Sequence, residues 1–282
     1  MTQGMKEIKR TIKSVSSTKE ITMAMELVSS AKLKKARKQL ESLESYKTIV
    51  LDSFKRILSS SANLSTFKKA ENGELKKLFI VIASDRGLAG GYNSNILKLV
   101  ENTIEDKENA LIIPVGQKGI DYFLSKDYVV SEKYLLLGEE PKYEDAAEIG
   151  KIAVDLYRHD KVDEINLAFT KFENALSHLP TVIKLFPLEE LKDKKRRNFE
   201  FEPSPQAVME YMILKYVQSA VYCALIEASA SEQASRRMSM ESATNNAEKM
   251  ISELEMGYNR ARQAYITREI AEIVGGSEAL NK

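Results

Sequence analysis

The chain has 282 residues, enough for one large hydrophobic core or two small ones. Its single cysteine, Cys223, excludes an internal disulfide and a thiolate metal cluster, and no apolar run approaches the roughly 18 residues of a membrane span. The net charge of +1 is uneven, because residues 1–60 carry thirteen Lys/Arg and six Asp/Glu. This basic segment predicts an acidic partner: nucleic acid, anionic lipid or an acidic protein surface.

The first predicted element is one long helix over residues 2–57. Residues 5–72 contain neither glycine nor proline, and apolar residues recur at helical steps of three and four. The stripe begins with Ile8, Ile12 and Val15 and continues with Ile21, Met25 and Val28. Because it is narrow, it is typical of a coiled coil.

The centre of the chain has an alternating α/β pattern. Such a pattern predicts a mostly parallel sheet covered by helices. The segment 192–206, rich in charge and proline, is expected to be the linker to the last helix. Strands are predicted at 77–83, 110–116, 127–131 and 164–172, with one more at 181–186, and helices at 94–105, 117–125 and 144–158.

The last predicted element is a second long helix, over residues 206–274. Residues 219–247 are rich in Ala and Ser, which lets a neighbouring helix approach closely. Farther along, the apolar seam consists of Ile251, Leu254, Tyr258, Ala261 and Tyr265.

The two long helices are separated by a globular domain, so they are expected to run antiparallel. Placing residue 57 beside residue 206 makes the numbers of partner residues add up to about 263, which pairs Thr2 with about Ala261. Everything beyond has no companion within the chain, yet it is apolar, and an exposed apolar patch marks an interface. We therefore expect another protein to surround the terminus. The unpaired apolar residues are Tyr265, Ile266, Ile270, Ile273 and Val274.

The fold class that follows is a long antiparallel two-helix coiled coil with a Rossmann-like α/β domain inserted between its helices. The expected boundaries are residues 1–60 for the first helix, 61–205 for the central domain with its linkers, and 206–282 for the second helix. The amino-terminal residues are too polar for a secretory signal, which favours a cytosolic protein.

One glycine-rich turn, ASDRGLAGGYN at residues 83–93, follows the first predicted strand. Its glycines at 87, 90 and 91 match neither the phosphate loop G-x-x-x-x-G-K-[ST] nor the dinucleotide motif G-x-G-x-x-G. The favoured interpretation is a tight turn in which glycines supply positive φ and Asn93 or Ser94 caps the next helix. Asp85 and Arg86 are then exposed and available to a partner; a phosphate site is the less favoured alternative.

Residues that could carry catalysis are scarce. His159 and His178 lie on different predicted elements without metal-ligand spacing, so no catalytic, cofactor or metal site is predicted. The basic cluster KLKKARK at residues 32–38 has no interleaved aromatic residue. Binding to nucleic acid, a solvated helix face and contact with an acidic protein loop all remain open for it.

Three stretches together resemble the gamma subunit of F-type ATP synthases: residues 12–36, 84–93 and 259–280. They occur in the order and at the chain positions of that family. The resemblance implies a non-catalytic rotor shaft whose coiled coil stands inside a ring of alpha and beta subunits. It also implies that the α/β domain sits at the foot with the epsilon subunit and the membrane c-ring, at the cytoplasmic face of a bacterial plasma membrane and without membrane insertion. No nucleic acid and no cofactor are expected.

The resemblance also assigns contacts with the beta subunits. Lys32, Lys35 and Arg86 match the basic residues that face an acidic beta-subunit loop, and Met25 and Arg236 match positions near that contact. Four further positions match residues that meet the ring higher up: Arg262, Gln263, Thr267 and Glu269.

Two other classes of protein compete with this interpretation. One is an α/β nucleotide enzyme whose basic coiled-coil arm binds nucleic acid, and the other is a structural coiled-coil protein that self-associates through its terminal helix. The physiological direction of rotation and the coupling ion are not encoded in this chain.

Overall fold

The computed structural model describes residues 3–60, 75–138, 140–187, 202 and 204–280. Most of the predicted linker 192–206 lies outside these residues. The predicted helices and strands are all present, with ends that differ by a few residues. They are α1 (Gln3–Ser60), β1 (Lys77–Ile82), α2 (Tyr92–Thr103), β2 (Ala110–Val115), α3 (Gln117–Ser125), β3 (Val129–Val130), α4 (Tyr143–Arg158), β4 (Glu164–Phe172), β5 (His178–Phe186) and α5 (Pro205–Leu280).

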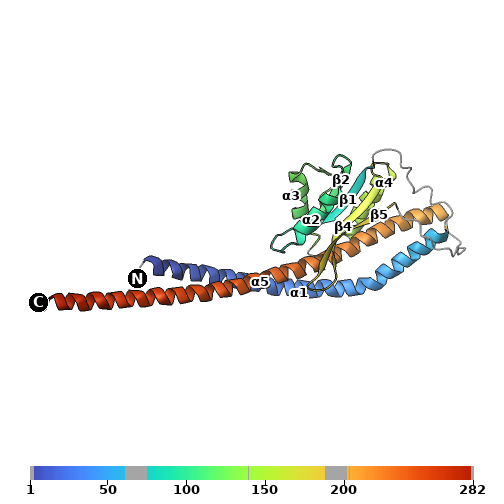
Figure 1. Cartoon of the computed structure of the whole chain (residues 1–282). Coiled ribbons are helices and arrows are strands. Elements are labelled where there is room, and N and C mark those ends of the chain that lie inside the picture. The colour runs from blue at the N-terminus through green and yellow to red at the C-terminus, as the bar shows by residue number, and fades with distance from the viewer. Residues whose placement is uncertain (1–2, 61–74, 139, 188–201, 203, 281–282) are drawn as a thin grey trace. The chain divides into compact units, whose positions relative to one another are not determined.

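The five strands form one sheet in the order β3-β2-β1-β4-β5, which Figure 1 shows beside α2, α3 and α4. Strand β1 pairs in parallel with β2 and β4, and β2 pairs in parallel with β3. Only the pairing of β4 with β5 is antiparallel. The prediction of a mostly parallel sheet is therefore confirmed, and the continuous apolar strands β1 and β2 are those buried on both faces.

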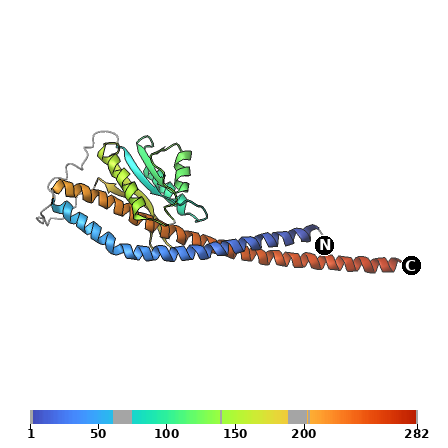
Figure 2. The same cartoon turned by 180° about the vertical axis from the view of Figure 1, so that it is seen from behind.

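Helices cover both faces of this sheet. Phe79 and Val81 of β1 pack on one face with Ile96 of α2 and Phe123 of α3. The opposite face packs against α4 and the first part of α5. That second core includes Leu78, Ile80, Ile149, Ala153, Val217 and Val221. The covering helices on the two faces can be followed in Figures 1 and 2.

The chain divides into two compact units, and the boundary cuts through both long helices. The larger unit is Ser29–Arg236 and contains the sheet. In it, α1 packs against α5 through Leu33 and Ala36, which meet Ala230 and Ala234. The smaller unit joins residues 1–28 to residues 237–282. There, the hydroxyls of Thr22 and Thr244 share a 2.8 Å hydrogen bond, and Lys19 Nζ lies 2.8 Å from Glu248 Oε1.

These contacts correct the predicted register. The sequence paired Thr22 with a residue near 241, whereas its partner is Thr244, nearly one helical turn away. The sequence estimate was based on helix ends at residues 57 and 206, whereas α1 runs on to Ser60 and α5 already begins at Pro205.

The predicted apolar seam of α1 is also wrong in part. Ile21 and Val28 are 61% and 56% exposed, while the neighbouring Thr22 and Ser29 are buried. Small hydroxyl residues permit close approach of the helices, and the hydrogen bond to Thr244 compensates the buried oxygen of Thr22.

The predicted seam at the end of α5 is confirmed. Ile251, Leu254, Tyr258, Ala261 and Tyr265 are all half-buried, while most of the residues between them are exposed. Beyond Tyr265, every described position to residue 274 is exposed, including four large apolar side chains. These side chains are Ile266, Ile270, Ile273 and Val274. No helix in the described part of the chain is long and apolar enough to cross a membrane.

Candidate partner-binding site

The glycine-rich turn lies at the carboxyl end of β1. The chain leaves β1 toward β2 on one side of the sheet, and β4 later returns to the other side of β1. Such a point of reversal is where open α/β sheets usually bind ligands. The contacts of residues 83–91 therefore decide which ligand this edge of the sheet suits.

Bonds within the turn close it into a rigid loop. The hydroxyl of Ser84 donates to the carbonyl of Arg86 at 2.6 Å, and Asn93 Oδ1 accepts the Ser84 amide N–H at 2.9 Å. Positive φ occurs at Leu88 (62°) and Gly90 (54°). Of the three glycines in the turn, Gly90 alone fulfils the prediction of positive φ, and a leucine supplies the other such position.

The predicted helix cap is wrong. The N-cap of α2 is Gly91, and no side chain provides the cap hydrogen bond. Asn93 is occupied by Ser84, and the hydroxyl of Ser94 donates back to the carbonyl of Gly91 at 3.1 Å. Asn93 therefore joins the two ends of the loop.

Helix α5 clamps this loop from one side. Arg236 Nη2 donates to the carbonyls of Arg86 and Gly87 at 3.3 Å and 3.4 Å. The hydroxyl of Ser235 donates to the carbonyl of Ala89 at 2.6 Å. The loop thus directs carbonyl oxygens at a cation, whereas a phosphate cradle directs N–H groups at an anion. This geometry favours the structural-turn interpretation over a phosphate site.

The clamp rests on a buried ion pair. Arg236 Nη1 lies 2.6 Å from Glu232 Oε1, and the two residues are 8% and 6% exposed. Burial, assisted by the charge of Glu232, raises the pKa of the nearby Tyr92 well above its usual value. The guanidinium of Arg236 is therefore held inside the protein, where it positions the loop.

Asp85 does not have the exposed role that the sequence suggested. Its Oδ1 accepts the amide N–H of Gln117, the first residue of α3, at 3.2 Å. The same carboxylate accepts the amide N–H of Leu136 at 3.1 Å. Asp85 therefore fastens two other segments to the loop, and the exposed charged side chain of the turn is Arg86.

The segments that carry the predicted basic residues both contact α5. The α1 segment carrying Lys32 and Lys35 packs on Ala230 and Ala234, and the next turn of α5 holds the loop that carries Arg86. Lys35 Nζ lies 2.6 Å from Glu140 Oε1, in the connection from β3 to α4. Hydrogen bonding to Lys35 lowers the pKa of Glu140, with smaller contributions from Lys142 and Lys32. Lys32, Lys35 and Arg86, which the resemblance assigned to one partner contact, are called the basic site below.

The remaining predicted contact residues lie in the smaller unit. Met25 is half-buried in α1. Its proposed proximity to Arg236 spans the two compact units and stays a prediction. The four positions of the last helix all have exposed side chains: Arg262, Gln263, Thr267 and Glu269.

The two histidines have ordinary structural surroundings. His159 Nδ1 lies 2.8 Å from the carbonyl of Asp155 at the end of α4. Burial lowers the pKa of His178, whose ring meets that of Phe172 edge-on at 6.2 Å between centroids. Among the described residues, no group of three or more His, Cys, Asp or Glu side chains could hold a metal ion.

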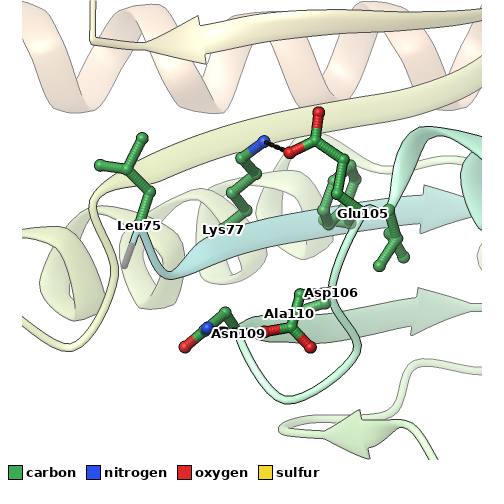
Figure 3. A pocket seen from close by; sticks show the side chains of 8 residues that line it. Leu75, Lys77, Glu105, Asp106, Asn109 and Ala110 are labelled. Atoms are coloured by element: carbon green, nitrogen blue, oxygen red, sulfur yellow. Dashed lines mark hydrogen bonds and ion pairs between the residues drawn. The ribbon is translucent and has the colours of Figure 1, made fainter. Parts of the chain in front are cut away.

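A hollow of about 280 Å³ lies at the opposite, amino end of β1. Figure 3 shows Lys77 reaching across it to Glu105, whose Oε2 lies 3.6 Å from Lys77 Nζ. Asp106 accepts the amide N–H of Glu108 and the side-chain N–H of Asn109. Lys77 and Glu105 therefore pair with each other, and Asp106 is bonded within its own turn.

Another hollow, of about 120 Å³, lies among α1, α5 and the last two strands. Its lining is mostly apolar and includes Val50, Phe169, Ile183 and Cys223. Cys223 is a buried free thiol of α5.

Known proteins resemble this chain over almost its whole length. A family model described as ATP synthase matches residues 4–280. The ATP synthase gamma chain of Alkaliphilus metalliredigens is 46% identical over 98% of this chain and 99% of that protein. The sodium ion specific ATP synthase gamma chain of Acetobacterium woodii is 41% identical over 100% of both chains. The chain therefore belongs to the ATP synthase gamma-chain family.

The fold comparison agrees with this membership. A chain of the central stalk and c-ring structure of Tetrahymena thermophila mitochondrial ATP synthase matches with a TM-score of 0.65 and 25% identity. The match covers 79% of this chain and 99% of that one.

Sequence reasoning missed three residues of the site. Ser235 and Glu232 sit in a run that the sequence assigned only to close helix packing. Ser235 bonds to the distant Ala89, and Glu232 pairs with Arg236 one turn further along α5. Glu140 belongs to a connection for which the sequence predicted no role. The two acidic residues that follow the apolar run in LLLGEEP, residues 135–141, were the available signal.

Proposed function

We propose that the chain is the central rotor shaft of an F-type ATP synthase. In this role it transmits torque between a proton- or ion-driven membrane c-ring and the catalytic beta subunits, and it carries out no chemistry itself. Family membership over residues 4–280 supports this proposal. The observation that carries it is the exposed apolar end of α5, residues 266–274.

The terminal segment is difficult to explain in a chain that acts alone. Four large apolar side chains on a single exposed helix are unfavourable in water, and a helix of this kind is normally stabilised by packing. A surrounding collar formed by alpha and beta subunits would bury them. Arg262, Gln263, Thr267 and Glu269 are exposed on the same segment and would meet that collar.

The shaft itself would be the antiparallel coiled coil of α1 and α5. The hydrogen bond of Thr22 with Thr244 and the ion pair of Lys19 with Glu248 support opposite helix directions. In this proposal residues 1–60 and 206–282 form the rod, and residues 61–205 form its inserted domain. The inserted domain would stand at the foot with the epsilon subunit and the c-ring, on the cytoplasmic face of a bacterial plasma membrane.

The basic site would face an acidic loop of a beta subunit. Arg86 and Lys35 are exposed, and α5 holds both of their segments. Met25 would lie near the same contact. Arg236 would act through the loop that it positions, because its guanidinium is buried.

The mechanism depends on asymmetry. Three equivalent beta subunits around one off-axis rod would each meet a different face of it, and only differential contact shifts an equilibrium between open and closed states. Each elementary charge that crosses the membrane supplies about 2.3 kcal/mol per 100 mV, so several must cooperate for one product release. Exposed ion pairs contribute at most about 1 kcal/mol each, so the shape of the rod would carry most of the torque.

The test is to neutralise the basic site in the reconstituted complex. We expect Lys32→Gln, Lys35→Gln and Arg86→Gln together to lower the turnover of ATP hydrolysis several-fold while the chain still co-purifies with the ring subunits. A matched control replaces Lys34 and Lys38, exposed lysines of the same helix, and should change turnover little. Loss of assembly in the triple variant would contradict this division of roles. Failure of the native chain to bind any ring subunit would contradict the shaft itself.

A further inference from the structure

The connection between β3 and α4 contacts both segments that carry the basic site, namely the β1 turn and α1. Its described residues are 131–138 and 140–142. The amide N–H of Tyr134 donates to the carbonyl of Pro114 at 3.2 Å, which fixes the start of the connection to the end of β2. The amide of Leu136 bonds to Asp85, and the carbonyl of Gly138 accepts the hydroxyl of Ser229 at 2.7 Å. This β3–α4 loop is therefore tied to the β1 turn and to α5 in succession.

These ties bring one acidic side chain to α1. Glu140 follows the Gly138 anchor by two residues, and Pro141 after it is buried. From there the Glu140 carboxylate bonds to Lys35 Nζ at 2.6 Å. Lys32 and Lys142 add positive charge around the same carboxylate.

The anchors and the acidic contact differ in kind. The bonds of Leu136 and Gly138 use the loop backbone and half-buried or buried side-chain partners. The side chains of Lys35 and Glu140 are 62% and 69% exposed. An exposed pair between long side chains is weak and exchanges readily with other partners. The anchored backbone therefore presents a carboxylate that is easily displaced.

We propose that Glu140 is an internal competitor for the basic site, which occupies Lys35 until an acidic segment of a partner protein displaces it. The inference rests on the proposed function, because the partner is an acidic protein segment of the surrounding ring. Partner and competitor both offer a carboxylate to the same ammonium group. Docking must break the Lys35–Glu140 pair before the partner carboxylate can take its place, so the pair lowers the affinity by its own small free energy.

Two exposed leucines lie on the loops that carry Arg86 and Glu140. Leu88 and Leu136 are 64% and 66% exposed, and both adopt positive φ, at 62° and 61°. Asp85 joins their two loops. The turn that carries Arg86 and the loop that carries Glu140 thus each present an exposed leucine, which suits a partner segment that is acidic and contains apolar residues.

The competition is tested by measuring the affinity of the full-length chain for the reconstituted alpha–beta ring, by surface plasmon resonance at low salt. Glu140→Gln keeps the shape and removes the competing charge. We expect it to bind the ring about two- to fivefold more tightly, the range that weak exposed pairs allow. In a Lys35→Gln background, the additional Glu140→Gln change should have no effect.

A matched control separates competition from a general gain of positive charge. Glu132→Gln removes the same charge from an exposed residue at the start of the same connection, and we expect it to change the affinity much less. Equal gains for Glu132→Gln and Glu140→Gln would overturn the proposal, as would an unchanged or weaker affinity of Glu140→Gln. Those results would leave the shaft function standing, whereas a ring that binds no form of the chain would remove both proposals.

Discussion

Two regions of the same helix, α5, are built in opposite ways. Between Val217 and Arg236 most side chains are buried, among them polar residues such as Ser231 and Gln233. Between Arg262 and Val274 all described positions except Tyr265 are exposed, among them four large apolar residues. Within this chain, burial therefore does not follow hydrophobicity along α5.

The difference shows which partner each region is adapted to. The first region uses Ala, Ser and a paired arginine, which allow α1, α4 and the β1 turn to approach closely and which satisfy one another's hydrogen bonds. The second region has an apolar surface that the described residues of its own unit leave exposed. The predictions below test whether the first region is complete within the chain and whether the second requires a ring.

The largest effect is expected when the buried ion pair of the first region is broken. Arg236→Met should lower the free energy of unfolding of the full-length chain by about 3 kcal/mol, because the buried carboxylate of Glu232 loses its guanidinium. Urea unfolding followed by circular dichroism measures this. In the second unit the matched change Lys19→Met removes one half of an exposed pair with Glu248 and should leave the unfolding curve unchanged.

The double variant Arg236→Met with Glu232→Met sharpens the same test. It should recover part of the lost stability, since no buried charge then remains at this position. If Arg236→Met unfolds at the same urea concentration as the native chain, the clamp on the β1 turn does not stabilise the fold. That result would contradict the prediction for the first region.

Two glycines provide the second test: Gly150 of α4 packs on the first region, and Gly257 of α5 shortly precedes the second region. A Cβ added at Gly150 of α4 would lie 2.9 Å from Cγ and 3.0 Å from Cα of Gln218 in α5. Gly150→Ala should therefore cost about 1–3 kcal/mol through overpacking. At Gly257, in the smaller unit, nothing lies within 4 Å, so Gly257→Ala should stabilise the helix by about 0.5–1 kcal/mol.

The two glycine variants are compared by thermal unfolding of the full-length chain. Opposite shifts of the midpoint are expected. A stabilising effect of Gly150→Ala would mean that α4 and α5 are not held as closely as the structure indicates.

Much of the fold could be predicted because its signals are local. Six-residue apolar strands such as β1, bounded by turns and helices, specify the parallel sheet, and the seam from Ile251 to Tyr265 follows from helical spacing alone. The register of α1 on α5 could not be obtained with the same accuracy. The predicted register was based on where the two helices end, and helix ends are the part of a sequence pattern that is predicted least accurately.

The site was harder to predict because its bonds connect distant residues. Lys35, Arg86 and Arg236 were named from the family resemblance, but their different exposures follow from tertiary packing. The seam of α1 passes through Thr22 and Ser29 instead of Ile21 and Val28, which apolar periodicity cannot anticipate. Asp85 and Glu140 gained their partners only when the loops at the carboxyl edge of the sheet came together.

The smallest effect on the stability of the free chain is expected for a substitution of Ile270. The same substitution tests whether a ring encloses the second region. Serine and isoleucine have similar helix propensities, so Ile270→Ser should change the stability of the free chain by less than about 0.5 kcal/mol. In the reconstituted ring complex the same change should weaken binding about tenfold or more, because burying an isoleucine contributes roughly 1.5–3 kcal/mol. Glu272→Gln, two residues away on the exposed helix, controls for a general change of this surface and should have little effect on either measurement.

A free chain that loses more than about 1 kcal/mol with Ile270→Ser would show that the terminus packs within the chain. A ring affinity that stays unchanged would show that the collar does not enclose this part of α5.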